Sequence, residues 1–141
     1  MTAAAALSFA DTNVLLYLIS YDTAKARRAE SLLAARVAVS VQVLNEFAHV
    51  ARRKHALDWT ELTHTLAGIR HFAQVYPLTV DSHQRGLELA QRYQFSLYDA
   101  MIASAALQAG CNTLLSEDFQ AGQLIEGRLK IVNPFADLAT R

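Results

Sequence analysis

Short apolar runs alternate with helix-like patterns along almost the whole chain. The runs have the length of β-strands and lie at residues 7–10, 37–40, 75–78, 113–115 and 129–132. Between them, apolar positions recur at helical spacing over residues 22–35, 43–51, 58–69, 81–93 and 97–107. This alternation predicts a three-layer α/β/α fold, with a mainly parallel sheet of four to five strands between two layers of helices. No repeat or change of composition divides the chain, so we expect one domain over residues 1–141.

Several expected elements carry signals at their ends. Asp58 and Glu61 have the spacing of a capping box, which predicts the start of a helix. Asp81 is expected to begin the helix of residues 81–93. Gly110 follows the most apolar helix, where glycine commonly ends a helix. Pro77 has no backbone donor, so its strand is expected at a sheet edge or a strand end.

The composition narrows the class of protein. The 141 residues are 52% hydrophobic and 18% charged, which suits a packed core. Thirteen basic and thirteen acidic residues give zero net charge, so a polyanion must be recognised locally. Cys111 is the single cysteine and is expected to be a small buried apolar residue. Residues 1–6 carry no basic segment and the apolar run 14–19 is too short to span a bilayer, so we expect a soluble, cytoplasmic protein.

Four acidic residues lie against apolar sequence near expected element ends. Asp11 and Asp118 follow apolar strands, whereas Glu46 and Asp99 lie near the starts of helices. Glu46 falls on the edge of its helix's apolar stripe, so its carboxylate begins near the core. The carboxyl ends of parallel strands share one edge, which is where α/β proteins bind ligands. We therefore expect the four acids to converge on one pocket.

Converging carboxylates repel one another, and a divalent cation relieves that repulsion. Hard oxygen ligands suit Mg²⁺ or Mn²⁺, and a metal that lowers the pKa of bound water supports phosphoryl transfer to water. Each acid also has a purely structural interpretation. Asp99 would be a first-turn acid, Asp118 a turn cap, Asp11 with Asn13 an Asx turn, and Glu46 a side chain that reaches water.

Short sequence motifs around the four acids favour the metal-binding interpretation over the structural ones. They are Ala-Asp-Thr-Asn at 10–13, Leu-Asn-Glu at 44–46, Leu-Tyr-Asp-Ala-Met-Ile-Ala at 97–103, Leu-Leu-Ser-Glu-Asp-Phe at 114–119 and Ile-Val-Asn-Pro-Phe at 131–135. In order and spacing they resemble PIN-domain ribonucleases, especially the VapC-like toxins of bacterial type II toxin–antitoxin pairs. The resemblance covers nearly the whole chain. The chain departs from it in its alanine-rich leader, which places Asp11 further from Met1 than is typical.

The resemblance implies a PIN fold and a Mg²⁺-dependent endoribonuclease, with Mn²⁺ as a substitute for Mg²⁺. The family's catalytic and metal-binding acids map onto Asp11, Glu46, Asp99 and Asp118. The polar positions that support these acids map onto Thr12, Asn13 and Ser116, whose hydroxyl and amide groups hold carboxylates or a metal-bound water. The resemblance also implies a homodimer, which amphipathic helices in the first half could supply. The implied partner is a cognate antitoxin protein that lays a peptide segment across the pocket.

Other hydrolytic chemistries lack their sequence patterns. The histidines include no pair four residues apart and no HExxH, which argues against a zinc hydrolase; they are His49, His55, His64, His71 and His83. No GxSxG or P-loop occurs, and Cys111 has no catalytic setting. Residues 27–28 and 52–54 are basic and are expected on solvated helix surfaces. They nevertheless form the best positive rim for holding phosphates.

Two other classes of function stay open at this point. A receiver-type phosphoacceptor domain also gathers aspartates around Mg²⁺, and it would take phosphate from a small phosphodonor. Receivers use paired acids near the first strand and a lysine at a late strand end, whereas here Thr12 follows Asp11 and Lys130 lies inside the last expected strand. A catalytically silent PIN-like interaction module would show no saturable Mn²⁺ binding.

Overall fold

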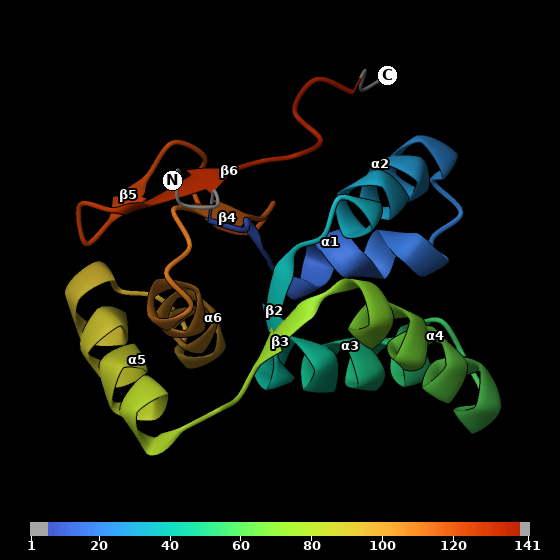
Figure 1. The fold of residues 1–141 in the computed structure, drawn as a ribbon, viewed down its shortest axis with the longest axis horizontal. Coiled ribbons are helices and arrows are strands. Elements are labelled where there is room, and N and C mark those ends of the chain that lie inside the picture. Colours follow the sequence, from blue (N-terminus) through green and yellow to red (C-terminus); the bar gives the residue numbers. More distant parts are fainter. Residues whose placement is uncertain (1–5, 139–141) are drawn as a thin grey trace, which may run out of the picture.

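The computed structural model describes residues 6–138 and contains a six-stranded sheet (Figure 1). The strands are β1 Phe9–Ala10, β2 Ala38–Ser40, β3 Gln74–Tyr76, β4 Thr113–Leu115, β5 Leu124–Ile125 and β6 Leu129–Val132. Their order is β3-β2-β1-β4-β6-β5, and only the β5–β6 pair is antiparallel. The mainly parallel sheet is confirmed. It has one strand more than the four to five expected, because the two residues of β5 are too few to show a periodicity.

The helices form layers on the two sides of this sheet. They are α1 Thr12–Leu16, α2 Thr23–Ala34, α3 Val41–Lys54, α4 Trp59–Phe72, α5 Val80–Tyr93 and α6 Leu97–Gln108, with a 3-10 helix η1 at Tyr17–Ile19. Figure 1 shows α1 to α4 on one side and α5 with α6 on the other, which confirms the three layers.

Two of the expected helix starts can be compared with the structure. The capping box of α4 is present, since Glu61 N donates to Asp58 Oδ1 at 2.7 Å and Asp58 N donates to Glu61 Oε1 at 3.0 Å. The expected start of α5 at Asp81 is wrong by one residue. Thr79 caps this helix through the backbone N–H of Ser82 at 3.0 Å, so α5 begins at Val80.

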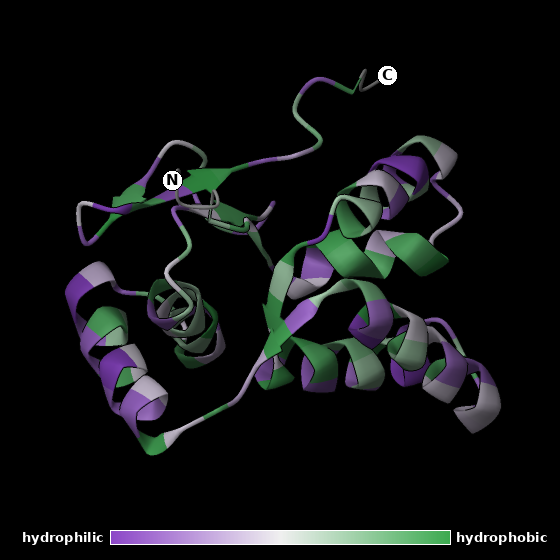
Figure 2. Ribbon diagram, in the orientation of Figure 1, coloured by the Kyte–Doolittle hydropathy of each residue, from purple (hydrophilic) through white to green (hydrophobic). Residues whose placement is uncertain are grey.

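The core lies between the central strands and α6. Phe9, Leu114 and Ile131 are fully buried in the sheet, and the apolar strands stand out in Figure 2. Every residue of α6 from 100 to 107 is buried, because α5 covers the side of α6 that the sheet leaves free. Cys111 is buried as expected. Within residues 6–138, no helix has the length and apolar character needed to cross a membrane.

The register of the central strands sets the position of the polar residues that follow them. Ala10 pairs with Leu115 in the parallel ladder of β1 and β4, and Asp11 N donates to Leu115 O at 2.9 Å. Asp11 and Ser116 are the next residues of the two strands. They therefore lie side by side at the carboxyl edge of the sheet.

Of the two arginines expected to face water, one is engaged. Arg27 is exposed, but both terminal nitrogens of Arg28 bind the Asp137 carboxylate at 2.7 and 2.8 Å. Arg28 also donates to the carbonyl oxygen of Pro134. Arg28 therefore ties α2 to the chain after β6, which makes it unsuitable as part of a positive rim.

Two helical glycines should respond oppositely to alanine. Gly68 in α4 has open space where a Cβ would lie, so Gly68→Ala should raise the free energy of unfolding by about 0.5–1 kcal/mol. A Cβ on Gly86 in α5 would lie 2.6 Å from Sδ of Met101, so Gly86→Ala should lower it by about 1–2 kcal/mol as the α5–α6 contact opens. Urea denaturation of both variants measures the two changes. Equal stabilisation by both would show that Met101 moves aside freely.

Candidate active site

Asp11 is a buried carboxylate whose oxygens are both hydrogen bonded. Its side chain is 2% exposed. Oδ1 accepts from the backbone N–H of Thr12 at 2.7 Å, and Oδ2 accepts from Ser116 Oγ at 2.7 Å and from Asn13 Nδ2 at 3.3 Å. Asp11 is also the N-cap of α1. These donors come from both the first helix and the end of β4, so they fix the carboxylate at the junction of the two elements.

The surroundings of Asp11 favour its protonated form. Burial raises its pKa to about 7, and the hydrogen bonds from Ser116 and Thr12 oppose this rise only in part. The negative charges of Asp118 and Asp99 raise the pKa further. No basic side chain is among the groups that shift this pKa. A cation bound beside Asp11 would stabilise its ionised form.

Glu46 approaches Asp11 from α3. Thr12 Oγ1 donates to Glu46 Oε2 at 2.9 Å. Thr12 therefore contacts two acids of the site, Asp11 through its backbone N–H and Glu46 through its hydroxyl. Burial raises the pKa of the half-buried Glu46 carboxyl, as do the charges of Asp99 and Asp118. Hydrogen bonds from Thr12 and Gln42 lower it. The expected position of Glu46 near the core side of its helix is confirmed.

Asp99 lies in the first turn of α6. The N-cap residue Ser96 accepts a hydrogen bond from Asp99 N at 3.2 Å. The caps of α4 and α5 are reciprocal, but the Asp99 carboxylate makes no return bond to the Ser96 backbone. Burial raises the pKa of Asp99, and the charge of Asp118 raises it further against a lowering by Ser96. The first-turn position is thus confirmed, while the carboxylate itself is left available to the site.

Asp118 lies in the loop after β4 and is exposed. Its backbone N–H donates to Ser116 Oγ at 3.0 Å, and the same hydroxyl donates to Asp11. Ser116 therefore orients the loop relative to Asp11. Neighbouring Glu117 is turned away, where Lys25 Nζ binds its Oε2 at 2.8 Å and Tyr17 OH donates to its Oε1. The cationic partner explains why Glu117 does not belong with the other acids.

The charges of Asp99 and Asp118 raise the pKa values of both Asp11 and Glu46, and the charge of Asp118 also raises that of Asp99. We call these four acids the acid cluster: Asp11, Glu46, Asp99 and Asp118. The ion pairs recorded between residues 6 and 138 join Lys25 to Glu117, Arg28 to Asp137 and Arg92 to Glu126, all outside the cluster. The cluster is thus a region of uncompensated negative charge.

The acid cluster offers the carboxylate ligands that a divalent cation prefers, but its side chains do not surround a common point closely enough to hold one. Carboxylate oxygens are the ligands that Mg²⁺ and Mn²⁺ prefer. Burial is the main cause of the raised pKa values of these acids, and repulsion between them, which such an ion would relieve, adds to it. In the described part of the chain, no three His, Cys, Asp or Glu side chains lie close enough to hold a metal ion as they stand. A hollow of ≈ 570 Å³ adjoins the cluster; its lining residues are Gln42, Asn45, Glu46, His49, Val50 and Tyr98.

The supporting residues expected from the sequence also lie at the cluster. Thr12, Asn13 and Ser116 all hydrogen bond to its acids. Sequence reasoning did not identify Gln42 and Ser96, which contact Glu46 and Asp99 respectively. Ser96 had a usable signal, because a serine three residues before an acid at a helix start has the spacing of a capping box. Gln42 had none.

Comparison with known families gives a match over most of the chain. A model of the PIN domain family matches residues 8–138. No curated protein matches the sequence.

Solved structures share this fold at low sequence identity. A toxin–antitoxin complex from Klebsiella pneumoniae has a TM-score of 0.68 and 24% identity, covering 90% of this chain and 97% of that one. VapC20 from Mycobacterium tuberculosis, described as a toxin that cleaves the sarcin–ricin loop, has a TM-score of 0.66 and 24% identity, covering 85% and 98%. VapBC2 from Rickettsia felis, bound to a promoter DNA fragment, has a TM-score of 0.66 and 16% identity, covering 89% and 98%.

The metal-free protein should lose stability as the pH rises from about 5 to about 8. Asp11 has a pKa of about 7 in the folded chain against an ordinary value of 3.8, so the folded state keeps a proton that the unfolded state has released. The free energy of unfolding therefore falls with rising pH, on the order of 2 kcal/mol. Urea denaturation in EDTA across this range measures the change.

The control for this experiment is Asp11→Asn, which cannot release the proton. Subtracting its pH profile from that of the wild type removes the contributions of the histidines and other groups. Parallel profiles for the two proteins would show that Asp11 titrates alike in the folded and unfolded chains.

Proposed function

The chain belongs to the PIN domain family, and on that basis we propose that it is a metal-dependent endoribonuclease acting as the toxin of a toxin–antitoxin pair. The observation that carries the proposal is the acid cluster, whose members come from distant parts of the chain and raise one another's pKa values, with no ion pair to any of them within residues 6–138. The reaction would be hydrolysis of an RNA phosphodiester bond. One of the solved structures of the same fold is described as a toxin that cleaves the sarcin–ricin loop.

We propose Asp11, Glu46, Asp99 and Asp118 as the catalytic acids and as the residues that hold a divalent cation, Mg²⁺ with Mn²⁺ as a substitute. Bound there, the cation would polarise the phosphodiester and lower the pKa of a water molecule. The chain's own part is to hold the acids. Ser116 and the Thr12 backbone fix Asp11, and the Thr12 hydroxyl orients Glu46. Asn13 bridges Asp11 to the loop after β4 through its contact with Glu117 N at 3.4 Å.

A cognate antitoxin protein is the proposed partner. Solved structures with this fold include a toxin–antitoxin complex and VapBC assemblies bound to DNA. An antitoxin segment lying across the site would exclude RNA. The uncompensated charge of the acid cluster is complementary to a basic segment of such a partner.

A homodimer is the proposed assembly, and the exposed apolar side chains around the starts of α5 and α6 are the proposed interface. Leu78, Val80 and Leu97 are 43%, 72% and 46% exposed. Leu78 and Leu97 line a common hollow of ≈ 280 Å³ between the starts of the two helices. Apolar side chains gathered in this way are typical of an interface between protein surfaces.

Replacing Asp99 should remove RNA cleavage without unfolding the protein. We expect Asp99→Asn to lower the rate of metal-dependent RNA cleavage by roughly 100-fold or more, because a ligand and its charge are lost. Unfolding of the metal-free variant should need no less free energy than that of the wild type, since one source of repulsion is gone. Gel assays of RNA cleavage with Mn²⁺ and urea denaturation in EDTA measure the two effects.

Asp81→Asn is the matched control, since Asp81 lies in the first turn of α5 and outside the acid cluster. It should cleave RNA like the wild type. A loss of about 1 kcal/mol or more in Asp99→Asn, with cleavage retained, would make Asp99 a helix-stabilising acid only. Calorimetry tests the alternative of a catalytically silent interaction module. Mn²⁺ should bind the wild type saturably and Asp11→Asn only weakly, whereas a silent module would show no saturable Mn²⁺ binding in either protein.

A charge in the apolar patch should separate the proposed dimer. Val80 is the first residue of α5, where an acid is compatible with the helix, so Val80→Asp should fold normally. Light scattering should give twice the chain mass of 15.5 kDa for the wild type and the single mass for the variant. Thr60→Asp adds the same charge to the first turn of α4 and should stay dimeric. A wild type that is monomeric at all concentrations would contradict the dimer.

A further inference from the structure

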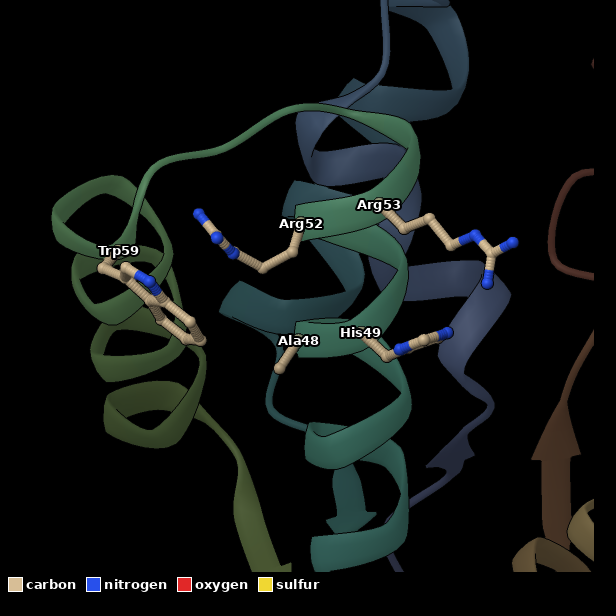
Figure 3. A pocket seen from close by; sticks show the side chains of 5 residues that line it. All are labelled: Ala48, His49, Arg52, Arg53 and Trp59. Atoms are coloured by element: carbon tan, nitrogen blue, oxygen red, sulfur yellow. The ribbon is translucent and has the colours of Figure 1, made fainter.

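Trp59, at the start of α4, is a large apolar side chain held on the surface. It is 66% exposed. The guanidinium of Arg52, from α3, lies 4.1 Å from the centre of its ring and also donates to Leu57 O at 3.0 Å (Figure 3). The cap of α4 uses Asp58 and Glu61, so capping does not require a tryptophan at this position. Arg52 thus holds an exposed indole in one orientation on the surface.

The indole lines a hollow that adjoins the hollow beside Glu46. The hollow at the indole, of ≈ 320 Å³, is lined by Ala48, His49, Arg52, Arg53 and Trp59. His49 also lines the hollow beside Glu46, so the two hollows meet at one residue. Glu46, His49 and Arg53 are three and seven residues apart on α3 and therefore share one face of the helix. Figure 3 shows Arg52 directed toward Trp59, with His49 and Arg53 extending from the other side of α3.

The end of α3 carries positive charge on both sides of the helix. Arg52 and Arg53 are exposed, and neither takes part in an ion pair recorded between residues 6 and 138. Their place at the C-terminus of α3 suits the helix dipole, which explains the charges but not the neighbouring indole. Trp59 also lines a second hollow along the outer side of α4, with Thr60, Thr63, His64 and Ala67. Its ring is therefore accessible beyond the part that Arg52 covers.

We propose that single-stranded RNA leaving the acid cluster runs along α3, with its phosphates at His49 and Arg53 and a base stacked on Trp59. A cationic track beside an exposed aromatic ring is the combination that binds single strands without reading their sequence. The surface supplies the local recognition that a chain of zero net charge needs to hold a polyanion. The proposal rests on the proposed function, because it assigns the path of that reaction's substrate.

Trp59 is the single tryptophan of the chain, so its fluorescence reports on this surface directly. The experiment titrates the full-length wild type, in EDTA to prevent cleavage, with an unstructured 12-nucleotide RNA. It follows tryptophan emission and the anisotropy of a dye on the RNA. Binding should quench Trp59 emission with the same midpoint as the anisotropy change. Trp59→Ala should weaken binding roughly tenfold, and Trp59→Phe should restore most of the affinity.

Arg53→Gln should weaken binding about threefold or more and reduce the slope of log K against log salt by about 0.7. Arg70→Gln is the matched control; Arg70 lies near the other end of α4, about 16 Å along the helix from Trp59, and the variant should bind within about twofold of the wild type. Circular dichroism checks the fold of each variant, and none of these positions is buried.

Several results would overturn the path. They are RNA binding that leaves Trp59 emission unchanged, wild-type affinity in Trp59→Ala, or equal weakening by Arg53→Gln and Arg70→Gln. Quenching by the antitoxin but not by RNA would make the surface a protein-binding one and would also overturn it. Quenching by RNA in a protein that cleaves no RNA with Mn²⁺ would support the path while contradicting the nuclease. RNA cleavage with no change in Trp59 emission on RNA binding would support the nuclease and contradict the path.

Discussion

Burying the Asp11 carboxylate at the end of β1 is the constraint on which the rest of this structure depends. A buried ionised group without partners is strongly unfavourable. Three donors offset that penalty, and they come from Thr12, Asn13 and Ser116. Ser116 can reach Asp11 only if β4 lies beside β1 in the observed register. The sheet order and the start of α1 are therefore tied to one side chain.

The packing of two helices brings the other acids to the same edge of the sheet as Asp11. α6 is apolar on every side, so it is stable only between the sheet and α5, where Ser104 donates to Ser82 O at 2.7 Å. That packing carries Asp99 to the carboxyl edge of the sheet. α3 brings Glu46 to the same edge, where the Thr12 hydroxyl meets it. Rigid elements thus hold like charges near enough to raise one another's pKa values.

Most of the fold and of the acid cluster could be predicted from the sequence, because the signals were local and mutually consistent. An acid directly after a strand, as at Asp11, is conspicuous, and parallel topology brings such positions to one edge. The pairing of Glu117 with Lys25 and Tyr17 could not be predicted, since it joins residues about a hundred positions apart with no pattern between them. The contact of Arg28 with Asp137 was missed for the same reason, since these residues are 109 positions apart. Strand β5 was missed because its two residues show no periodicity.

The two flanks of the sheet have a consequence for how this molecule meets other chains. β3 has three residues and is followed by Pro77, and β5 has two. Edge strands this short expose few unpaired backbone N–H and C=O groups. A peptide from another chain can therefore hardly add to the sheet as a further strand, which protects the protein from aggregation through its sheet edges. A protein partner must then be recognised by side chains on the helices. Substitutions on these surfaces can therefore change the partner without disturbing the hydrogen bonds of the sheet.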